Sequence, residues 1–187
     1  MGNRLSAIVT RTGDEGTTGL ADGSRRAKNN IRIHCLGEVD ELNALIGIVL
    51  SYIESDNFKD LLTSVQHDLF DIGAELCQPD KSLIQQVHLE AIEEAVNQLN
   101  ELLAPLKEFI LPAGSKSIAF LHLARTVCRR VERSMVSLKE SESINPVTAQ
   151  YVNRLSDLLF ILARSVAHQG QGSEVYWQSK YSRQSLE

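Results

Sequence analysis

The sequence predicts an all-α fold, an up-down bundle of five helices preceded by an irregular loop rich in glycine and threonine. Apolar residues recur at steps of three and four through five long segments, which is the spacing of a buried stripe on a helix. The connections are short, and no segment alternates apolar and polar residues over a useful length. Long amphipathic helices joined in this way pack as a bundle.

The composition is that of a chain with one packed core. Its 187 residues are 43% hydrophobic, enough for a single domain over residues 1–187. We divide it into a loop segment (1–31), a helical bundle (32–170) and a C-terminal tail (171–187). The net charge of -5 does not indicate nucleic acid, and no apolar run reaches the length of a membrane span.

Cellular location and redox state follow from what the sequence lacks. No apolar stretch typical of a signal peptide opens the chain, so we expect a cytoplasmic protein. Cys35, Cys77 and Cys128 lie far apart, and an odd, unclustered number argues against a disulfide framework and a zinc site. We expect reduced, mostly buried thiols, with Cys128 on the apolar stripe of its helix.

The first segment differs from the rest of the chain. Four glycines alternate with threonines and acidic residues, so a helix cannot persist there. Residues 1–32 also carry six basic side chains against three acidic ones, an excess that suits a small anion. Backbone amides in such a loop can cradle phosphate, although the Gly-Lys-Ser/Thr ending of a Walker loop is absent. The alternative is an unstructured chain end.

The helical period begins at about residue 32. It marks five helices at residues 32–54, 58–77, 83–106, 115–138 and 147–167. Gln78-Pro79-Asp80 stops the second, and the third carries polar residues on its outer positions, as a surface-facing bundle helix does. The tail after Gly170 is polar apart from residues 175–177, and we expect a coil with Trp177 docked.

The connection before the fourth helix is unusually apolar. Pro112 and Gly114 prevent a helix, so Phe109, Ile110 and Leu111 lie in a loop. Their side chains either cap the end of the bundle or form the apolar wall of a ligand cavity.

The fourth helix carries a stripe of arginines. Arg125, Arg129 and Arg133 are four residues apart, with Glu132 on the same side. Like charges at this spacing repel, so solvent, carboxylates elsewhere or a polyanion must offset them. The planar arginine fork suits phosphate, but a solvated charged face is the simpler interpretation. His122 lies within reach of this stripe, and a structural role is expected for it.

Four regions together resemble a known family. They are TRTGDEGTTGL at 10–20, VDELNA at 39–44, FILPAG at 109–114 with ARTVCRRVER at 124–133, and YVNRLSD at 151–157. In this order and spacing they resemble the ATP:cob(I)alamin adenosyltransferases of the propanediol-utilisation type, over almost the whole chain. Two departures are mild: Arg11 stands where many members have lysine, and Ala113 where a second glycine is usual.

The resemblance implies an enzyme that transfers the 5′-deoxyadenosyl group of ATP to the cobalt of cob(I)alamin and releases triphosphate. It implies a homotrimer with active sites between subunits. It also implies that Mg²⁺ binds with the ATP phosphates beside segment 1–31, with Glu132 as the nearby carboxylate. A flavin-dependent reductase and adenosylcobalamin-dependent enzymes are the partners to expect. The implied ATP-binding residues are Thr10, Arg11, Thr12, Gly13, Thr18, Gly19, Lys28, Arg129, Arg130, Glu132, Arg133 and Asn153.

For the corrinoid, the resemblance implies Phe109, Asp40 and Arg125, with Asp40 paired to Arg125 and Phe109 against the lower face of the ring. These three and Arg129 form the expected catalytic set. An apolar Phe109 would exclude a lower donor from Co(II), which eases its reduction to the nucleophilic Co(I). Two alternatives stay open: a non-catalytic ATP- or cobalamin-binding sensor or delivery module, and a structural bundle whose arginines meet a partner's acidic side chains.

Overall fold

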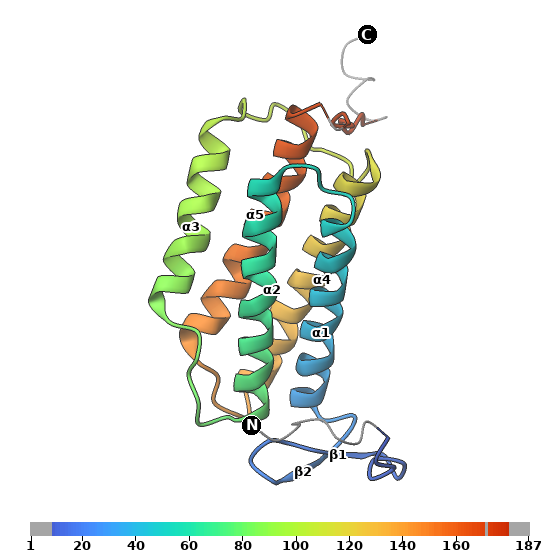
Figure 1. Ribbon diagram of the computed structural model, residues 1–187, viewed down its shortest axis with the longest axis vertical. Coiled ribbons are helices and arrows are strands. Elements are labelled where there is room, and N and C mark those ends of the chain that lie inside the picture. The colour runs from blue at the N-terminus through green and yellow to red at the C-terminus, as the bar shows by residue number, and fades with distance from the viewer. Residues whose placement is uncertain (1–8, 171, 180–187) are drawn as a thin grey trace.

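The computed structural model describes residues 9–170 and 172–179, and these residues form the predicted bundle (Figure 1). Its helices are α1 (Ile31–Leu50), α2 (Asp56–Cys77), α3 (Gln86–Glu101), α4 (Lys116–Lys139) and α5 (Pro146–His168). Successive helices run in opposite directions, so the α3–α4 connection lies at one end of the bundle and the N-terminal segment at the other. The all-α prediction is therefore confirmed.

Helices α1 and α5 begin where the side chain of an asparagine satisfies a free backbone amide of the first turn. Asn30 accepts a hydrogen bond from the Arg32 amide at 2.9 Å, and Asn145 accepts one from the Val147 amide at 3.0 Å. Pro146 opens α5, where its fixed φ suits the first helical position. These caps explain why α1 and α5 each begin one residue before the predicted start.

Three boundaries differ from the prediction by three residues or more. The third helix does not extend over 83–106: it begins at Gln86 and ends at Glu101. It ends early because Pro105 has no amide hydrogen and its ring would clash with the Glu101 carbonyl in a continued helix, although the apolar period continues. The first helix ends at Leu50, and a turn follows at Ser51 and Tyr52.

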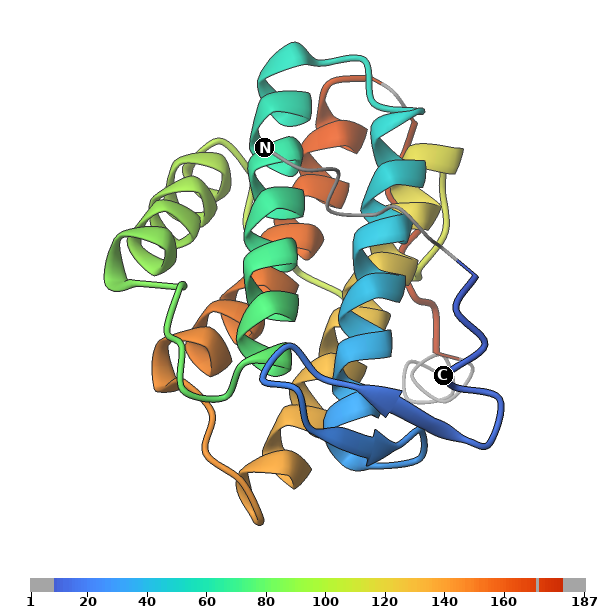
Figure 2. The same cartoon turned by 60° about the horizontal axis from the view of Figure 1, so that its bottom comes forward.

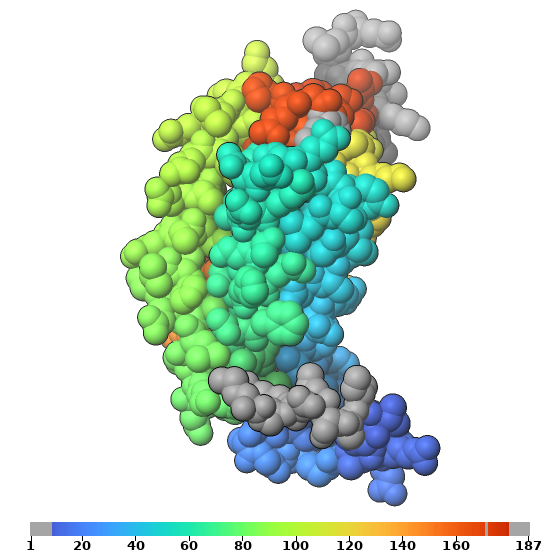
Figure 3. Space-filling view, in the orientation of Figure 1, coloured from blue at the N-terminus to red at the C-terminus, as the bar shows by residue number. Residues whose placement is uncertain are grey.

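A short hairpin was not predicted. Strands β1 (Thr17–Gly19) and β2 (Arg25–Ala27) pair antiparallel within the N-terminal segment, with Thr18 opposite Arg26. The hairpin forms a lobe beneath the end of the bundle, as Figures 2 and 3 show. Leu20 is buried and the Ala21 amide donates to the Cys77 carbonyl at 3.1 Å, which fixes the hairpin to the end of α2.

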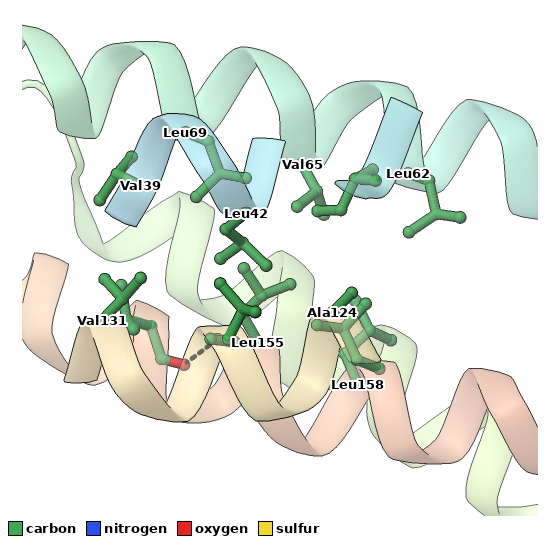
Figure 4. Packing of buried hydrophobic residues seen from close by; sticks show 14 of the residues in the cluster. Val39, Leu42, Leu62, Val65, Leu69, Ala124, Val131, Leu155 and Leu158 are labelled. Carbon is green, nitrogen blue, oxygen red and sulfur yellow. Dashed lines mark hydrogen bonds between the residues drawn. The ribbon is translucent and has the colours of Figure 1, made fainter. Parts of the chain in front are cut away.

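The core lies between the α1/α2 layer and the α4/α5 layer (Figure 4), and α3 packs against α5. Leu42, Val65 and Leu69 point from one layer toward Val131 and Leu155 in the other. Such burial is the main favourable term in folding, at about 25 cal/mol per Å² of apolar surface.

Two buried charged residues secure the hairpin end of the bundle. Arg32 is fully enclosed and donates to the Glu142 carboxylate at 2.8 Å and to the Leu76 carbonyl at 3.1 Å. Glu75 accepts hydrogen bonds from four donors: the backbone amides of Leu83 and Ile84, and the side chains of Asn145 and Thr148. Because both charges are satisfied, this end forms a rigid base for the N-terminal segment.

All three cysteines are free thiols, as predicted. Burial raises the pKa of Cys35 to about 12, and the Cys128 thiol donates to the Val152 carbonyl at 3.2 Å inside the core. Both are therefore protonated packing residues at neutral pH. Along the described chain, every helix is too short or too polar to cross a membrane.

Candidate active site

The N-terminal segment encloses a polar hollow of about 340 Å³. All seven residues predicted there for ATP line this one hollow: Thr10, Arg11, Thr12, Gly13, Thr18, Gly19 and Lys28. Arg11 has a left-handed backbone with φ of 56°, and a Cβ on Gly13 would lie 3.0 Å from the Thr17 carbonyl oxygen. A side chain at position 13 would therefore crowd the Thr17 carbonyl, and the loop would have to shift to admit it.

Arg25 braces this hollow, and sequence reasoning did not single it out. From β2, its guanidinium donates to the Thr12 carbonyl at 2.6 Å and to the Thr17 hydroxyl at 2.7 Å. The only sequence signal was the basic excess of residues 1–32, to which Arg25 contributes. Its hydrogen bonds tie the two sides of the loop together, so Arg25 shapes the hollow from outside its lining.

A second hollow, of about 230 Å³, lies along α4 and is lined by Arg129, Glu132, Arg133 and Val136. Asn153 of α5 donates its side-chain amide to the Glu132 carboxylate at 2.7 Å. Arg133 donates to the Arg129 carbonyl at 2.9 Å. The structure thus brings four predicted ATP residues together, with two exposed guanidinium groups beside one oriented carboxylate.

Arg130 faces another direction. Its guanidinium pairs with two carboxylates of α1, those of Glu38 and Glu41. It therefore joins α4 to α1 within the subunit, and its contact with ATP stays a prediction.

Arg125 and Asp40 are not joined by an ion pair among the described residues of one subunit. Burial, followed by the charge of Arg129, lowers the pKa of Arg125. Its Nε is buried and has no hydrogen-bond partner within residues 9–170 and 172–179. Asp40 is exposed on α1, on the rim of an apolar groove of about 590 Å³ between α1 and α2. Their pairing stays a prediction for a contact between subunits.

Phe109 lies in the α3–α4 connection, with 77% of its surface exposed. Its ring and that of Trp177 make a T-shaped contact, with a centroid distance of 6.2 Å and an interplanar angle of 71°. Trp177 is thus docked, as predicted, although it remains partly exposed. A large aromatic ring held open to solvent is a suitable wall for a flat apolar ligand.

The hollow of the N-terminal segment, where ATP is predicted to bind, and the α3–α4 connection, which carries Phe109, lie at opposite ends of the bundle (Figure 1). At 1.5 Å per residue, the 24 residues of α4 that separate these ends span about 36 Å. Within one chain the two features therefore lie too far apart to contact the same atoms of a ligand.

His122 is buried in α4, against the ring of Phe160. Burial, and to a lesser extent Arg125, lowers its pKa, so the imidazole is neutral at pH 7. Its Nδ1 has no hydrogen-bond partner in the part of the chain described. The expected structural role fits this burial, since the ring does not open onto either hollow.

Comparison with known proteins decides the family. The sequence model described as cobalamin adenosyltransferase matches residues 8–166, which is most of the chain. The chain belongs to the cobalamin adenosyltransferase family. A cobalamin adenosyltransferase of Cupriavidus metallidurans is 50% identical over 179 residues, covering 95% of this chain and 97% of the relative. A corrinoid adenosyltransferase of Mycobacterium leprae is 42% identical over 190 residues, which cover 95% of this chain and 98% of that relative.

Solved structures of cobalamin adenosyltransferases share the fold. A variant of the PduO-type ATP:corrinoid adenosyltransferase from Lactobacillus reuteri, complexed with cobalamin and ATP, has a TM-score of 0.87 and 32% identity. The match covers 92% of this chain and all of that one. A second variant of that enzyme, complexed with ATP, has a TM-score of 0.86 and 34% sequence identity, and the match covers 91% of this chain and all of the other. Membership of this family confirms the resemblance seen in the sequence, and it favours an enzyme over a non-catalytic binding module.

Proposed function

We propose that the protein transfers the 5′-deoxyadenosyl group of ATP to the cobalt of cob(I)alamin, forming adenosylcobalamin and triphosphate. The observation that carries this proposal is the convergence of seven loop residues on one hollow in a chain of this family. Structures of related proteins hold cobalamin and ATP, which supports both as substrates here.

ATP binding requires charge and backbone donors. Lys28 and Arg11 supply cationic groups in the loop hollow, and Thr10, Thr12 and Thr18 supply hydroxyls. Arg129 and Arg133 provide further fixed positive charge on α4. Arranged around a triphosphate, these groups would stabilise the negative charge that grows on the leaving group as the C5′–O bond breaks.

The residues present also suit Mg²⁺ that arrives with ATP. This ion keeps several waters and binds phosphates with one or two carboxylates, rather than a full protein cage. Glu132 offers such a carboxylate, oriented by Asn153 beside two arginines. No cluster of three or more His, Cys, Asp or Glu side chains that could hold a metal ion occurs among residues 9–170 and 172–179. When bound, Mg²⁺ neutralises part of the triphosphate charge.

We propose that the working enzyme is a homotrimer with sites between subunits. The separation of Phe109 from the ATP hollow supports this, because a neighbouring subunit is needed to supply one of them. Large apolar side chains also remain exposed on the long helices, among them Phe70 on α2 and Val136 on α4. Across such a contact Asp40 would pair with Arg125 and satisfy its buried Nε.

Phe109 would contact the lower face of the corrin and keep water and other donors from the cobalt. Without a lower donor, Co(II) accepts an electron more readily, and a flavin-dependent reductase would supply it. The Co(I) electron pair then attacks C5′, a cobalt–carbon bond forms, and the C5′–O bond electrons leave with triphosphate. No protein nucleophile or base is required, so the protein contributes placement, exclusion of water and charge stabilisation.

An anaerobic assay tests this proposal. Chemically reduced cobalamin, ATP and Mg²⁺ are mixed with the protein, and cobalt–carbon bond formation is followed by visible absorbance. Product that needs both ATP and protein supports the reaction. Tight ATP binding without product would instead support a sensor or delivery module, and absence of both would refute the site assignment.

A further inference from the structure

The C-terminal tail pairs with the loop that carries Phe109. The Trp177 amide donates to the Phe109 carbonyl at 2.8 Å, and the Leu111 amide donates to the Val175 carbonyl at 2.7 Å. Between these bonds, Ile110 and Tyr176 form an antiparallel bridge. The pairing holds Phe109 through its backbone, while the Trp177 ring makes a T-shaped contact with its side chain.

A buried arginine holds the tail in this position. Arg164 of α5 is 7% exposed, and its guanidinium donates to the Glu174 carboxylate at 2.8 Å and to the Ala104 carbonyl at 2.8 Å. The Tyr176 hydroxyl donates to the other Glu174 oxygen at 2.7 Å. Arg164 therefore joins the tail to the beginning of the α3–α4 connection, and both carboxylate oxygens of Glu174 are engaged.

The route of the tail past α4 depends on a glycine. Gly172 has φ of 148°, and a Cβ there would lie 2.8 Å from Cδ1 of Ile118. Gly114, which ends the Phe109 loop, has φ of 136° and approaches the same Ile118 side chain. Loop and tail therefore converge on the first turn of α4, where larger residues would separate them.

We propose that residues 174–177 form a strap that positions Phe109 for the corrinoid, with Glu174 and Trp177 as positioning residues. This inference rests on the proposed function. Phe109 is mostly exposed, so the pairing and the Trp177 contact are what restrict where its ring lies before the substrate arrives. A ring placed in advance excludes lower donors from Co(II) more completely than a mobile one.

The strap acts at the Phe109 end of the bundle, and this location gives a kinetic signature. The ATP hollow lies at the other end, so losing the strap should leave the KM for ATP unchanged. We expect kcat to fall about 10- to 100-fold, in line with the cost of misplacing a reacting group. The yield of four-coordinate Co(II) in the presence of ATP should fall with it.

Trp177 is the chain's single tryptophan, so its fluorescence reports on the strap directly. Glu174→Gln removes the charge that Arg164 holds, while Glu101→Gln changes an exposed carboxylate at the end of α3 as a control. In Glu174→Gln, acrylamide should quench Trp177 more strongly than in the parent or the control. Trp177→Ala should lower kcat and the Co(II) signal, and Trp177→Phe should recover most of the loss.

Each readout has its own consequence. Unchanged quenching in Glu174→Gln would overturn the Arg164 anchor, whatever the activity. If Trp177→Ala keeps the kcat and the Co(II) spectrum of the parent protein, the strap is overturned. The same holds if Trp177→Ala lowers the melting temperature but leaves kcat and the Co(II) spectrum unchanged. Failure of the parent protein to make adenosylcobalamin would overturn the proposed function instead, and the fluorescence comparison needs no turnover.

Discussion

Replacing Asn153 by alanine is the sharpest test of the α4 hollow. The Asn153 amide donates to the Glu132 carboxylate at 2.7 Å, and its carbonyl accepts from Arg154 at 2.8 Å. A hydrogen bond to a charged group contributes about 1.5–3 kcal/mol. If this bond orients Glu132 for ATP and its Mg²⁺, its full loss lowers kcat/KM for ATP about 10- to 150-fold, at 1.36 kcal/mol per factor of ten.

Stability should change far less, because Asn153 is only half-buried and water can replace its hydrogen bonds. The assay is steady-state turnover with varied ATP, beside thermal melting of the same preparations. Asn97→Ala, at an exposed position within α3, controls for removing an asparagine from a helix. A kcat/KM for Asn153→Ala equal to that of the control would refute the orienting role.

Three further predictions follow from single side chains. Phe109→Ala should have the melting temperature of the parent protein, since the ring is exposed. It should yield less four-coordinate Co(II), measured by electron paramagnetic resonance, and an unaltered spectrum would contradict the role of Phe109. Arg32→Ala should lower the free energy of unfolding in urea by about 3–5 kcal/mol, because it removes a fully buried guanidinium from Glu142 and from the Leu76 carbonyl, and a loss below 1 kcal/mol would refute this. Burial lowers the pKa of His122, so below about pH 6.5 the unfolded chain binds a proton that the folded one resists, and stability is lost as pH falls. The drop in melting temperature between about pH 7 and 5 should therefore be smaller in His122→Gln than in the parent, and equal drops would contradict the reasoning.

Local patterns made the helices predictable. The apolar period locates each helix, and Pro79 and its neighbours stop α2 at Cys77 as expected. The hairpin was missed because three-residue strands are too short to show alternation. The third helix was drawn too long because Leu103 continues the apolar period beyond Glu101, where the backbone has already left the helix before Pro105.

The candidate site was predictable where its residues are close in sequence. The loop residues converge because they lie within one short segment, and Arg129 and Arg133 share a side of α4 by their spacing. Arg130 follows Arg129 directly, and one residue rotates about 100° around a helix, so its guanidinium reaches α1 instead. The contact of Trp177 with Phe109 joins positions far apart in sequence, so only the folded chain shows which residues are paired.

The proposed active site combines the loop hollow of one subunit with Phe109 of another. Subunit mixing tests it most directly. Lys28→Met and Phe109→Ala are each expected to be poorly active alone, and differently tagged copies can be co-expressed and purified as mixed assemblies. We predict that mixed assemblies regain turnover, because some of their sites combine an intact Lys28 with an intact Phe109. Mixed assemblies that are no more active than the Lys28→Met and Phe109→Ala variants alone would contradict a site built from two subunits.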